Sequence, residues 1–339
     1  MKTTPLLCVK NLSLSFKEGN TYKQVLDHIH FDVHQNEILG IVGESGSGKS
    51  ITALAVMQLL KNAKVEGEIV FKDVDLNALQ TKKMEAIRGK KISMIFQEPM
   101  SALNPSMKCG EQVSEVLLQH ESISEAEADS EVIHLFERVK IPMPEQAFEK
   151  YPHELSGGQQ QRVMIAMAIA CKPDFLIADE PTTALDVTVQ NDIITLIKEL
   201  QKETQMSVLF ISHDLALVSE IAHKTLVMYK GEVVEYGPTQ HIFKRPKNQY
   251  TKALIAARPS LKVRLKQLPT VETILSKTNN THKIAKQERA EKHKQIYSAK
   301  PLLEVINLEK TYFSNVGLFK KQHAFKAVDD VGFKLYEGE

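Results

Sequence analysis

The sequence has few cysteines and almost no net charge, and each of these absences excludes a class of protein. The three cysteines, Cys8, Cys109 and Cys171, lie far apart in the 339 residues and form no metal-ligand spacing. A reducing compartment is therefore expected. The formal net charge is +1, so no global excess of positive charge points to nucleic acid.

Long apolar runs are also missing. The longest, residues 163–171, is far too short to span a bilayer, and no charged-then-apolar leader opens the chain. We therefore expect a cytosolic protein, or one held to a membrane by a partner. The composition, 42% apolar and 25% charged, is ordinary for a globular protein, and the length suggests roughly two domains.

The most informative stretch is a glycine-rich loop that fits G-x-x-x-x-G-K-[ST]. Its residues are Gly43, Glu44, Ser45, Gly46, Ser47, Gly48, Lys49 and Ser50. Residues 37–42 before it predict a buried strand, and residues 51–57 after it predict a helix. In this context the backbone N–H groups can surround phosphate oxygens, Lys49 can reach the outer phosphates and Ser50 can hold Mg²⁺. The alternative, a plain Gly/Ser turn, gives the Lys-Ser ending no structural use.

Strand and helix patterns alternate along most of the chain. Alternating apolar residues at 12–16, and apolar runs at 65–71, 92–96, 175–178 and 207–211, predict strands, while residues 189–201 predict an amphipathic helix. This alternation favours a mainly parallel sheet. Residues 105–151 are predicted to be a helical insertion, in which Ser124 and Glu127 form a capping box.

Two further features have the chemistry of a phosphate site. Asp179 and Glu180 follow the strand predicted at 175–178, so one carboxylate can hold Mg²⁺ and the next can orient a water for attack on the γ-phosphate. Ser156, an N-cap residue followed by two glycines, begins a second helix that can bind an anion. This second helix start cannot share a phosphate with Lys49 unless two copies of the fold meet.

Taken together, residues 43–50, 155–159, 179–180, 184–186 and 213 resemble an ATP-binding cassette (ABC) ATPase in order and spacing over residues 6–259. The resemblance implies an α/β fold, a P-loop NTPase core with a RecA-like, mainly parallel sheet. The expected fold also includes an N-terminal antiparallel β-subdomain and an inserted α-helical subdomain. The resemblance further implies ATP and Mg²⁺ as cofactors.

The resemblance also implies roles for individual residues. Gln97 matches the Q-loop that senses Mg²⁺ and the transmembrane partner, Glu180 the catalytic carboxylate, and His213 the switch histidine at the γ-phosphate. The metal site would comprise Ser50, Gln97 and Asp179. The signature that contacts the γ-phosphate of an opposing subunit corresponds to Ser156, Gly157, Gly158 and Gln159, and the interface-crossing D-loop to Asp186. The adenine is expected to stack on Phe16, with Tyr22 as the alternative.

Two segments resemble the dipeptide and oligopeptide importers within this family, residues 97–105 and 245–254. The usual His-Pro-Tyr-Thr is replaced here by Asn-Gln-Tyr-Thr at 248–251, and no cysteine follows Cys171, which excludes the iron–sulfur site of some members. The predicted function is ATP hydrolysis that powers import of a dipeptide, oligopeptide, nickel, glutathione or another small solute. The implied partners are transmembrane permease subunits, an extracytoplasmic solute-binding protein and a second cassette in the same or a fused chain. The chain itself is expected at the cytoplasmic face of the membrane, bound through the permease subunits.

The C-terminal part repeats the beginning of the chain. Residues 302–308 mirror 6–12, and residues 328–339 mirror 26–37, which ends just before the glycine-rich loop. We therefore expect an ABC domain at 1–259, a basic linker at 260–300 and the truncated start of a second ABC domain at 301–339, folded only locally. The linker carries ten Lys/Arg against three Asp/Glu, with some helix near 283–294. A basic linker between cassettes also fits an alternative, a tandem ABC ATPase acting on ribosomes or nucleic acid, although nucleic acid is not the expected partner.

Overall fold

The computed structural model describes residues 4–258, 264–276, 282–314 and 323–339. The chain divides into two compact units, Met1–Ala256 and Ala257–Glu339. The site of interest lies in the first unit, and each unit is described by itself below.

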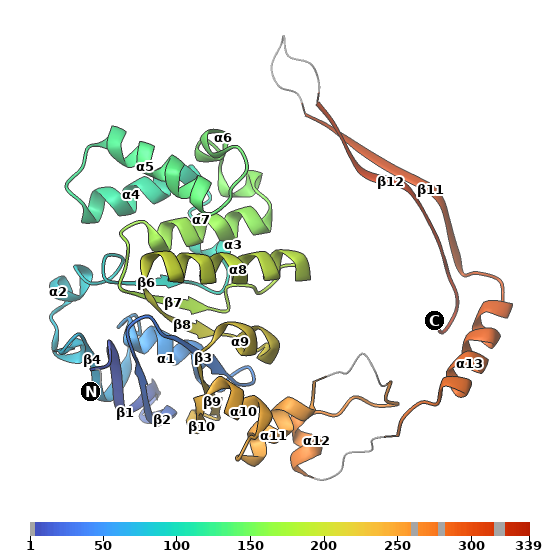
Figure 1. The fold of residues 1–339 in the computed structure, drawn as a ribbon, viewed down its shortest axis with the longest axis horizontal. Helices are drawn as coiled ribbons and strands as arrows, with labels where there is room; N and C mark the ends of the chain where they lie inside the picture. The colour runs from blue at the N-terminus through green and yellow to red at the C-terminus, as the bar shows by residue number, and fades with distance from the viewer. Residues whose placement is uncertain (1–3, 259–263, 277–281, 315–322) are drawn as a thin grey trace. The chain divides into compact units, whose positions relative to one another are not determined.

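The centre of the first unit is a six-stranded sheet with the order β10-β9-β3-β8-β7-β6 (Figure 1). Its strands are β3 (Ile38–Val42), β6 (Ile92–Ile95), β7 (Phe175–Asp179), β8 (Ser207–Ile211), β9 (Lys224–Tyr229) and β10 (Glu232–Pro238). All neighbours pair in parallel except β10, which runs antiparallel to β9. Four of these strands are buried along their whole length, as their continuous apolar sequences require. Because they are parallel, the carboxyl ends of β3, β8, β7 and β6 meet at one edge of the sheet.

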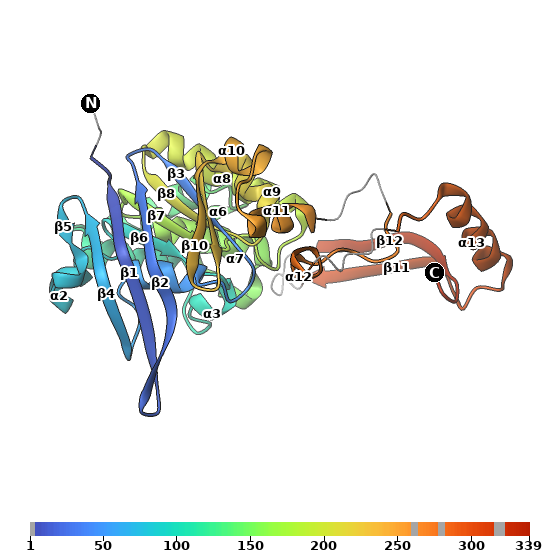
Figure 2. The same cartoon turned by 90° about the horizontal axis from the view of Figure 1, so that it is seen from below.

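A second, antiparallel sheet with the order β2-β1-β4-β5 lies below the parallel sheet in Figure 1 and at the left of the molecule in Figure 2. Its strands are β1 (Leu7–Glu18), β2 (Thr21–Val33), β4 (Ala63–Phe71) and β5 (Val74–Asp75). Helix α1 (Lys49–Val56) lies between the two sheets, and its Ala53 and Val56 belong to a core that both sheets share with it. This core fixes the start of α1 against the sheet edge.

Helices cover the opposite face of the parallel sheet (Figure 1). Next to it lie α7 (Gly157–Ile169), α8 (Val187–Thr204) and α9 (Leu215–Ile221). On α7 pack α4 (Cys109–His120) and α5 (Glu125–Arg138), and α6 (Pro144–Phe148) packs on α4 and α5. The expected capping box of Ser124 and Glu127 is present at the start of α5. The remaining short elements are η1 (Leu76–Ala78), α2 (Thr81–Glu85), α3 (Pro99–Ala102), η2 (Pro152–Glu154), α10 (Thr239–Lys244) and α11 (Gln249–Ala256). The predicted fold class, a parallel core with an antiparallel β-subdomain and inserted helices, is confirmed.

Within the described residues, no helix combines the length and the apolar character needed to cross a membrane.

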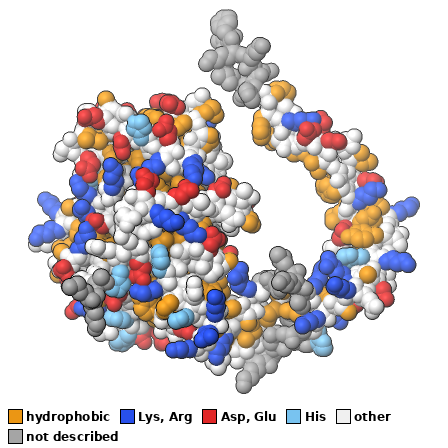
Figure 3. Space-filling view, viewed as in Figure 1, with side chains coloured by type: hydrophobic (Ala, Val, Ile, Leu, Met, Phe, Trp, Pro, Cys, Tyr) orange, Lys and Arg blue, Asp and Glu red, His pale blue; other side chains and the backbone are white. Residues whose placement is uncertain are grey.

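The second unit contains α12 (Val271–Leu275), α13 (Lys286–Ser298) and a hairpin of β11 (Leu303–Ser314) and β12 (His323–Leu335). The helix predicted near 283–294 is thus present as α13. Within the described residues, β11 and β12 pair with each other and with no other strand. Figure 3 shows apolar side chains along it, and Leu308 and Phe333 are 48% and 50% exposed.

Candidate functional site

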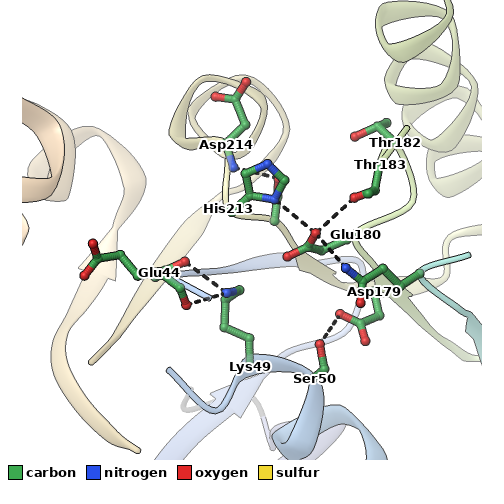
Figure 4. Close-up of polar contacts among 12 residues, drawn as sticks. Glu44, Lys49, Ser50, Asp179, Glu180, Thr182, Thr183, His213 and Asp214 are labelled. Atoms are coloured by element: carbon green, nitrogen blue, oxygen red, sulfur yellow. Dashed lines mark hydrogen bonds and ion pairs between the residues drawn. The ribbon is translucent and has the colours of Figure 1, made fainter. Parts of the chain in front are cut away.

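The glycine-rich loop joins β3 to α1 as the sequence predicts. Gly43, Ser47, Gly48 and Lys49 are buried, whereas Glu44, Ser45 and Gly46 are exposed and Ser50 is half-buried. Lys49 Nζ donates to the carbonyl oxygens of Gly43 at 2.9 Å and Glu44 at 3.0 Å. Burial lowers the pKa of Lys49, while nearby carboxylates oppose that shift. The ammonium group therefore rests on loop carbonyls beside the start of α1 (Figure 4).

Two glycines are required by the shape of this loop. Gly48 caps α1 with φ +104°, in the left-handed region, and a Cβ there would lie 2.6 Å from Leu26. A Cβ on Gly43 would lie 2.3 Å from the carbonyl oxygen of Met228. The hydroxyl of Ser47 is buried and has no hydrogen-bond partner among the described residues. The loop thus offers backbone N–H groups, a cation and a spare hydroxyl in one place.

Ser50 and Asp179 meet across the start of α1 and the end of β7. The Ser50 hydroxyl donates to Asp179 Oδ1 at 3.0 Å, although 129 positions separate the two residues. Asp179 is 4% exposed, and burial raises its pKa to about 6 against the opposing hydrogen bond from Ser50. A buried carboxylate of this kind is better accommodated beside a cation than alone.

Glu180 is the centre of a cluster at the same sheet edge. Its Oε2 accepts from Gln97 Nε2 at 3.2 Å and from Thr183 Oγ1 at 2.9 Å, and lies 3.0 Å from His213 Nδ1. Glu180 is 9% exposed and adopts φ +45°, an uncommon conformation for a non-glycine residue. The structure thus brings Gln97, Glu180 and His213 together just after the ends of β6, β7 and β8. Figure 4 shows the contact of His213 with Glu180.

The signature residues lie elsewhere. Ser156 caps α7 in a capping box with Gln159, its carbonyl oxygen accepts from the Gln160 N–H at 2.9 Å, and Gly157 and Gly158 form the first turn of the helix. Asp186 caps α8 by accepting from Thr188 and Val189 N–H groups at 3.0 Å. In the part of the chain that the structure describes, no hydrogen bond or ion pair joins residues 156–159 to 43–50. Helices α1 and α7 lie on opposite faces of the parallel sheet, which accounts for this separation.

The two candidates for stacking on adenine lie close together in the first hairpin. Phe16 is half-buried and packs against the shared core, whereas Tyr22 is 57% exposed near the turn. The register pairs Phe16 with Lys23 and Lys17 with Tyr22, so the two aromatic rings point to opposite faces of the hairpin.

Sequence reasoning missed two residues of this site. Thr183 donates to Glu180, and its signal was a hydroxyl three residues after the carboxylate. Tyr250 contacts Glu44 of the loop across 206 positions, and no local pattern indicates such a contact.

Comparison with known proteins decides the family. The family described as "ABC transporter" matches residues 26–183. The chain is 48% identical over 264 residues to the oligopeptide transport ATP-binding protein OppD of Bacillus subtilis, covering 77% of this chain and 74% of OppD. The chain belongs to the ABC transporter ATP-binding family. The cassette is therefore an ATP-binding ATPase.

Other matches concern the C-terminal region and the fold. The family described as "Oligopeptide/dipeptide transporter, C-terminal region" matches residues 234–286 of this ABC protein. The glutathione import ATP-binding protein GsiA of Shigella boydii is 42% identical over 348 residues, covering 98% of this chain and 55% of GsiA. A solved dimeric ATP-binding cassette in a post-hydrolysis state, bound to ADP and Pi, superposes with a TM-score of 0.63 at 28% identity. The superposed region covers 69% of this chain and 98% of the solved cassette.

Proposed function

We propose that this chain is the ATP-hydrolysing subunit of an importer that takes up peptides or similar small solutes through partner membrane permeases. The observation that carries the proposal is the match of residues 234–286 to the C-terminal region of oligopeptide and dipeptide transporters. Relatives named for oligopeptide transport, peptide import and glutathione import agree with it. They favour import over action on ribosomes or nucleic acid.

In this proposal the ATP phosphates occupy the loop of residues 43–50. Lys49 exchanges its loop carbonyls for the outer phosphate oxygens, and the start of α1 adds its partial positive charge. The partnerless hydroxyl of Ser47 supports a ligand with acceptor oxygens at this point.

Mg²⁺ is the cation that Ser50, Asp179 and Gln97 would hold. Among the described residues, no group of three or more His, Cys, Asp or Glu side chains could hold a metal. This composition suits Mg²⁺, which is commonly bound through one or two carboxylates together with substrate phosphates. The raised pKa of Asp179 also fits a site in which a cation stabilises the carboxylate. When bound, Mg²⁺ would neutralise charge that develops on the phosphates.

Glu180 would act as the base that takes a proton from the attacking water. Gln97, Thr183 and His213 all contact its Oε2, which leaves Oε1 as the oxygen for that proton. The three contacts orient the carboxylate, and a γ-phosphate beside His213 would complete the arrangement.

The nucleotide would be enclosed by a second cassette. Residues 156–159 of one cassette would face the loop of residues 43–50 of the other, with Asp186 crossing at the interface. Support comes from the separation of these two groups within one chain and from their anion-binding chemistry. Adenine would stack on Phe16, whose ring already has support from the core.

The second cassette would be a second copy of this chain or a domain fused to it. In the fused arrangement an ABC domain at 1–259, with its helical insertion at 105–151, would be followed by a basic linker at 260–300 and a second ABC domain that starts at 301. Support comes from the hairpin β11–β12, which repeats the register of β1–β2. Val305 pairs with Phe333 and Leu308 with Val331, as Val9 pairs with Phe31 and Leu12 with Ile29. Left-handed residues recur at matching positions, Asn11 and Asn307, and His28 and Asp330. Relatives such as GsiA, whose length this chain only partly covers, agree with this organisation.

Co-purification from source-cell membranes tests the proposal. A tagged chain should retain membrane-spanning permease proteins at the cytoplasmic face, and the complex should bind an extracytoplasmic solute-binding protein. Peptide-loaded binding protein should then stimulate ATP hydrolysis by that complex. Retention of ribosomal proteins or RNA in place of permeases would contradict import.

A further inference from the structure

Tyr250 belongs to α11 and is 206 positions from Glu44 in the sequence, yet its hydroxyl reaches the phosphate loop. The Glu44 N–H donates to Tyr250 Oη at 3.1 Å, and Tyr250 Oη is 3.3 Å from Glu44 Oε2, which accepts from it. Tyr250 is 3% exposed, so this contact is made by a packed side chain in a fixed place.

The ring of Tyr250 is held from two sides. It stacks on Tyr229 at the end of β9, with ring centroids 4.1 Å apart. Its own N–H donates to Asn248 Oδ1 at 2.8 Å, and the Asn248 N–H donates to Glu235 of β10 at 3.1 Å. The position of the hydroxyl is therefore set by β9, β10 and the start of α11.

Glu44 connects this hydroxyl to the residue that binds phosphate. The carbonyl oxygen of Glu44 accepts from Lys49 Nζ at 3.0 Å, while its N–H and carboxylate are both bonded to Tyr250. A tyrosine that fixes one residue of the loop on two sides limits the conformations that the loop samples before ATP arrives. Preorganisation of this kind lowers the free-energy cost of binding.

We propose that Tyr250 is a positioning residue of the ATPase site, which holds Glu44 of the phosphate loop in place and couples helix α11 to ATP binding. Burial also raises the pKa of Tyr250 to about 12, so its hydroxyl keeps its proton and remains a donor at neutral pH. Coupling is reciprocal, so ATP in the loop should in turn stabilise α11. The inference concerns ATP binding and does not depend on which solute is imported.

Tyr250→Phe removes the hydroxyl and keeps the stacked ring. We expect the KM for ATP of the full chain to rise about three- to tenfold, the effect of one or two lost hydrogen bonds. The kcat should stay unchanged, because Glu180 and His213 do not contact Tyr250. A general loss of stability would instead lower the active fraction and reduce kcat.

Tyr236→Phe is the matched control. Tyr236 lies on β10 and donates to the carbonyl oxygen of Asp32 at 3.0 Å, so this change also removes one tyrosine hydroxyl bond but leaves the loop untouched. It should leave the KM for ATP unchanged. A KM that rises no more in Tyr250→Phe than in Tyr236→Phe would overturn the proposal.

Hydrogen exchange gives a second readout, which can first be measured on the wild-type chain. Adding ATP should slow the exchange of amides in α11, and this slowing should be lost in Tyr250→Phe. Exchange in α11 that ATP leaves unchanged in the wild-type chain would contradict the coupling.

Discussion

Two helix starts in the first unit have anion-binding chemistry, but only one of them is connected to charged groups. Helix α1 begins at Lys49, which is 5% exposed, beside the Ser50–Asp179 pair. Helix α7 begins at exposed Ser156, whose polar atoms are satisfied by its own capping box. Two helix starts with similar chemistry therefore differ in their surroundings within one chain: the start of α1 is buried beside charged groups, and the start of α7 is exposed.

The hairpins β1–β2 and β11–β12 also differ in their surroundings. Both have the same register, but Leu12 and Phe31 are fully buried in the first, whereas Leu308 and Phe333 are about half exposed in the second. An isolated two-stranded hairpin is at best marginally stable in water. The apolar side chains of the first hairpin are buried by the further strands of its sheet and by the core that it shares with α1. The same strand pairing thus occurs in both hairpins, and the elements packed around each one decide whether its apolar side chains are buried.

The largest expected effect is a loss of ATP hydrolysis without a loss of ATP binding, when the carboxylate of Glu180 is removed. Glu180→Gln should lower ATP turnover by about 10²–10⁴-fold, because the amide cannot take a proton from water. ATP affinity should be kept, as Lys49 and the loop are unchanged. Turnover and ATP affinity should be measured together, with Glu85→Gln, an exposed residue of α2, as the control. Normal turnover in Glu180→Gln would remove the assignment of the base.

Lys49→Ala removes the cation at the start of α1. We expect ATP affinity to fall by about 100-fold, since two charge-assisted bonds to phosphate are lost. Calorimetric titration of ATP checks this, and Lys82→Ala, which removes an exposed lysine of α2, should bind ATP as the wild type does. Equal affinities in the two variants would show that the loop binds phosphate without its lysine.

At the α7 end, Ser156→Asp keeps a good N-cap but places a negative charge where the γ-phosphate of a second cassette is expected. ATP turnover at high protein concentration should fall at least tenfold through charge repulsion. Ser124→Asp makes the same change at the cap of α5 and should leave turnover unaltered. If both variants hydrolyse ATP normally, α7 does not face a phosphate.

The smallest effect concerns the pH dependence of stability. The pKa of Asp179 is about 6 in the folded chain, above its ordinary value of 3.8, so the folded state holds this proton to a higher pH. The resulting stability is present below pH 4 and is lost as the pH rises through about 6, by up to about 3 kcal/mol. Urea unfolding of the nucleotide-free chain should show this loss, and Asp179→Asn should abolish it. Asp73→Asn, at an exposed carboxylate, should keep it, and an unchanged slope in Asp179→Asn would contradict the account.

Much of the fold and part of the site could be predicted from sequence. Apolar runs predicted β3, β6, β7 and β8, and the joint chemistry of Ser50 and Asp179 predicted a contact that the structure shows at 3.0 Å. Strands β9 and β10 were missed, as was the contact of Tyr250 with Glu44. These features depend on packing between distant segments, which local periodicity does not encode. The left-handed backbone of Glu180 is likewise imposed by its surroundings.

The central claim is that Lys49 of one cassette and Ser156 of another act on the same nucleotide. The most direct test mixes Lys49→Ala and Ser156→Asp chains in equal amounts and measures ATP turnover against each variant alone. If the chains pair at random, half of the pairs contain one chain of each variant. In such a pair one of the two sites combines an intact Lys49 with an intact Ser156, so the mixture should recover up to about a quarter of the wild-type rate. A mixture that hydrolyses ATP no faster than the average of the two separate variants would contradict a shared site.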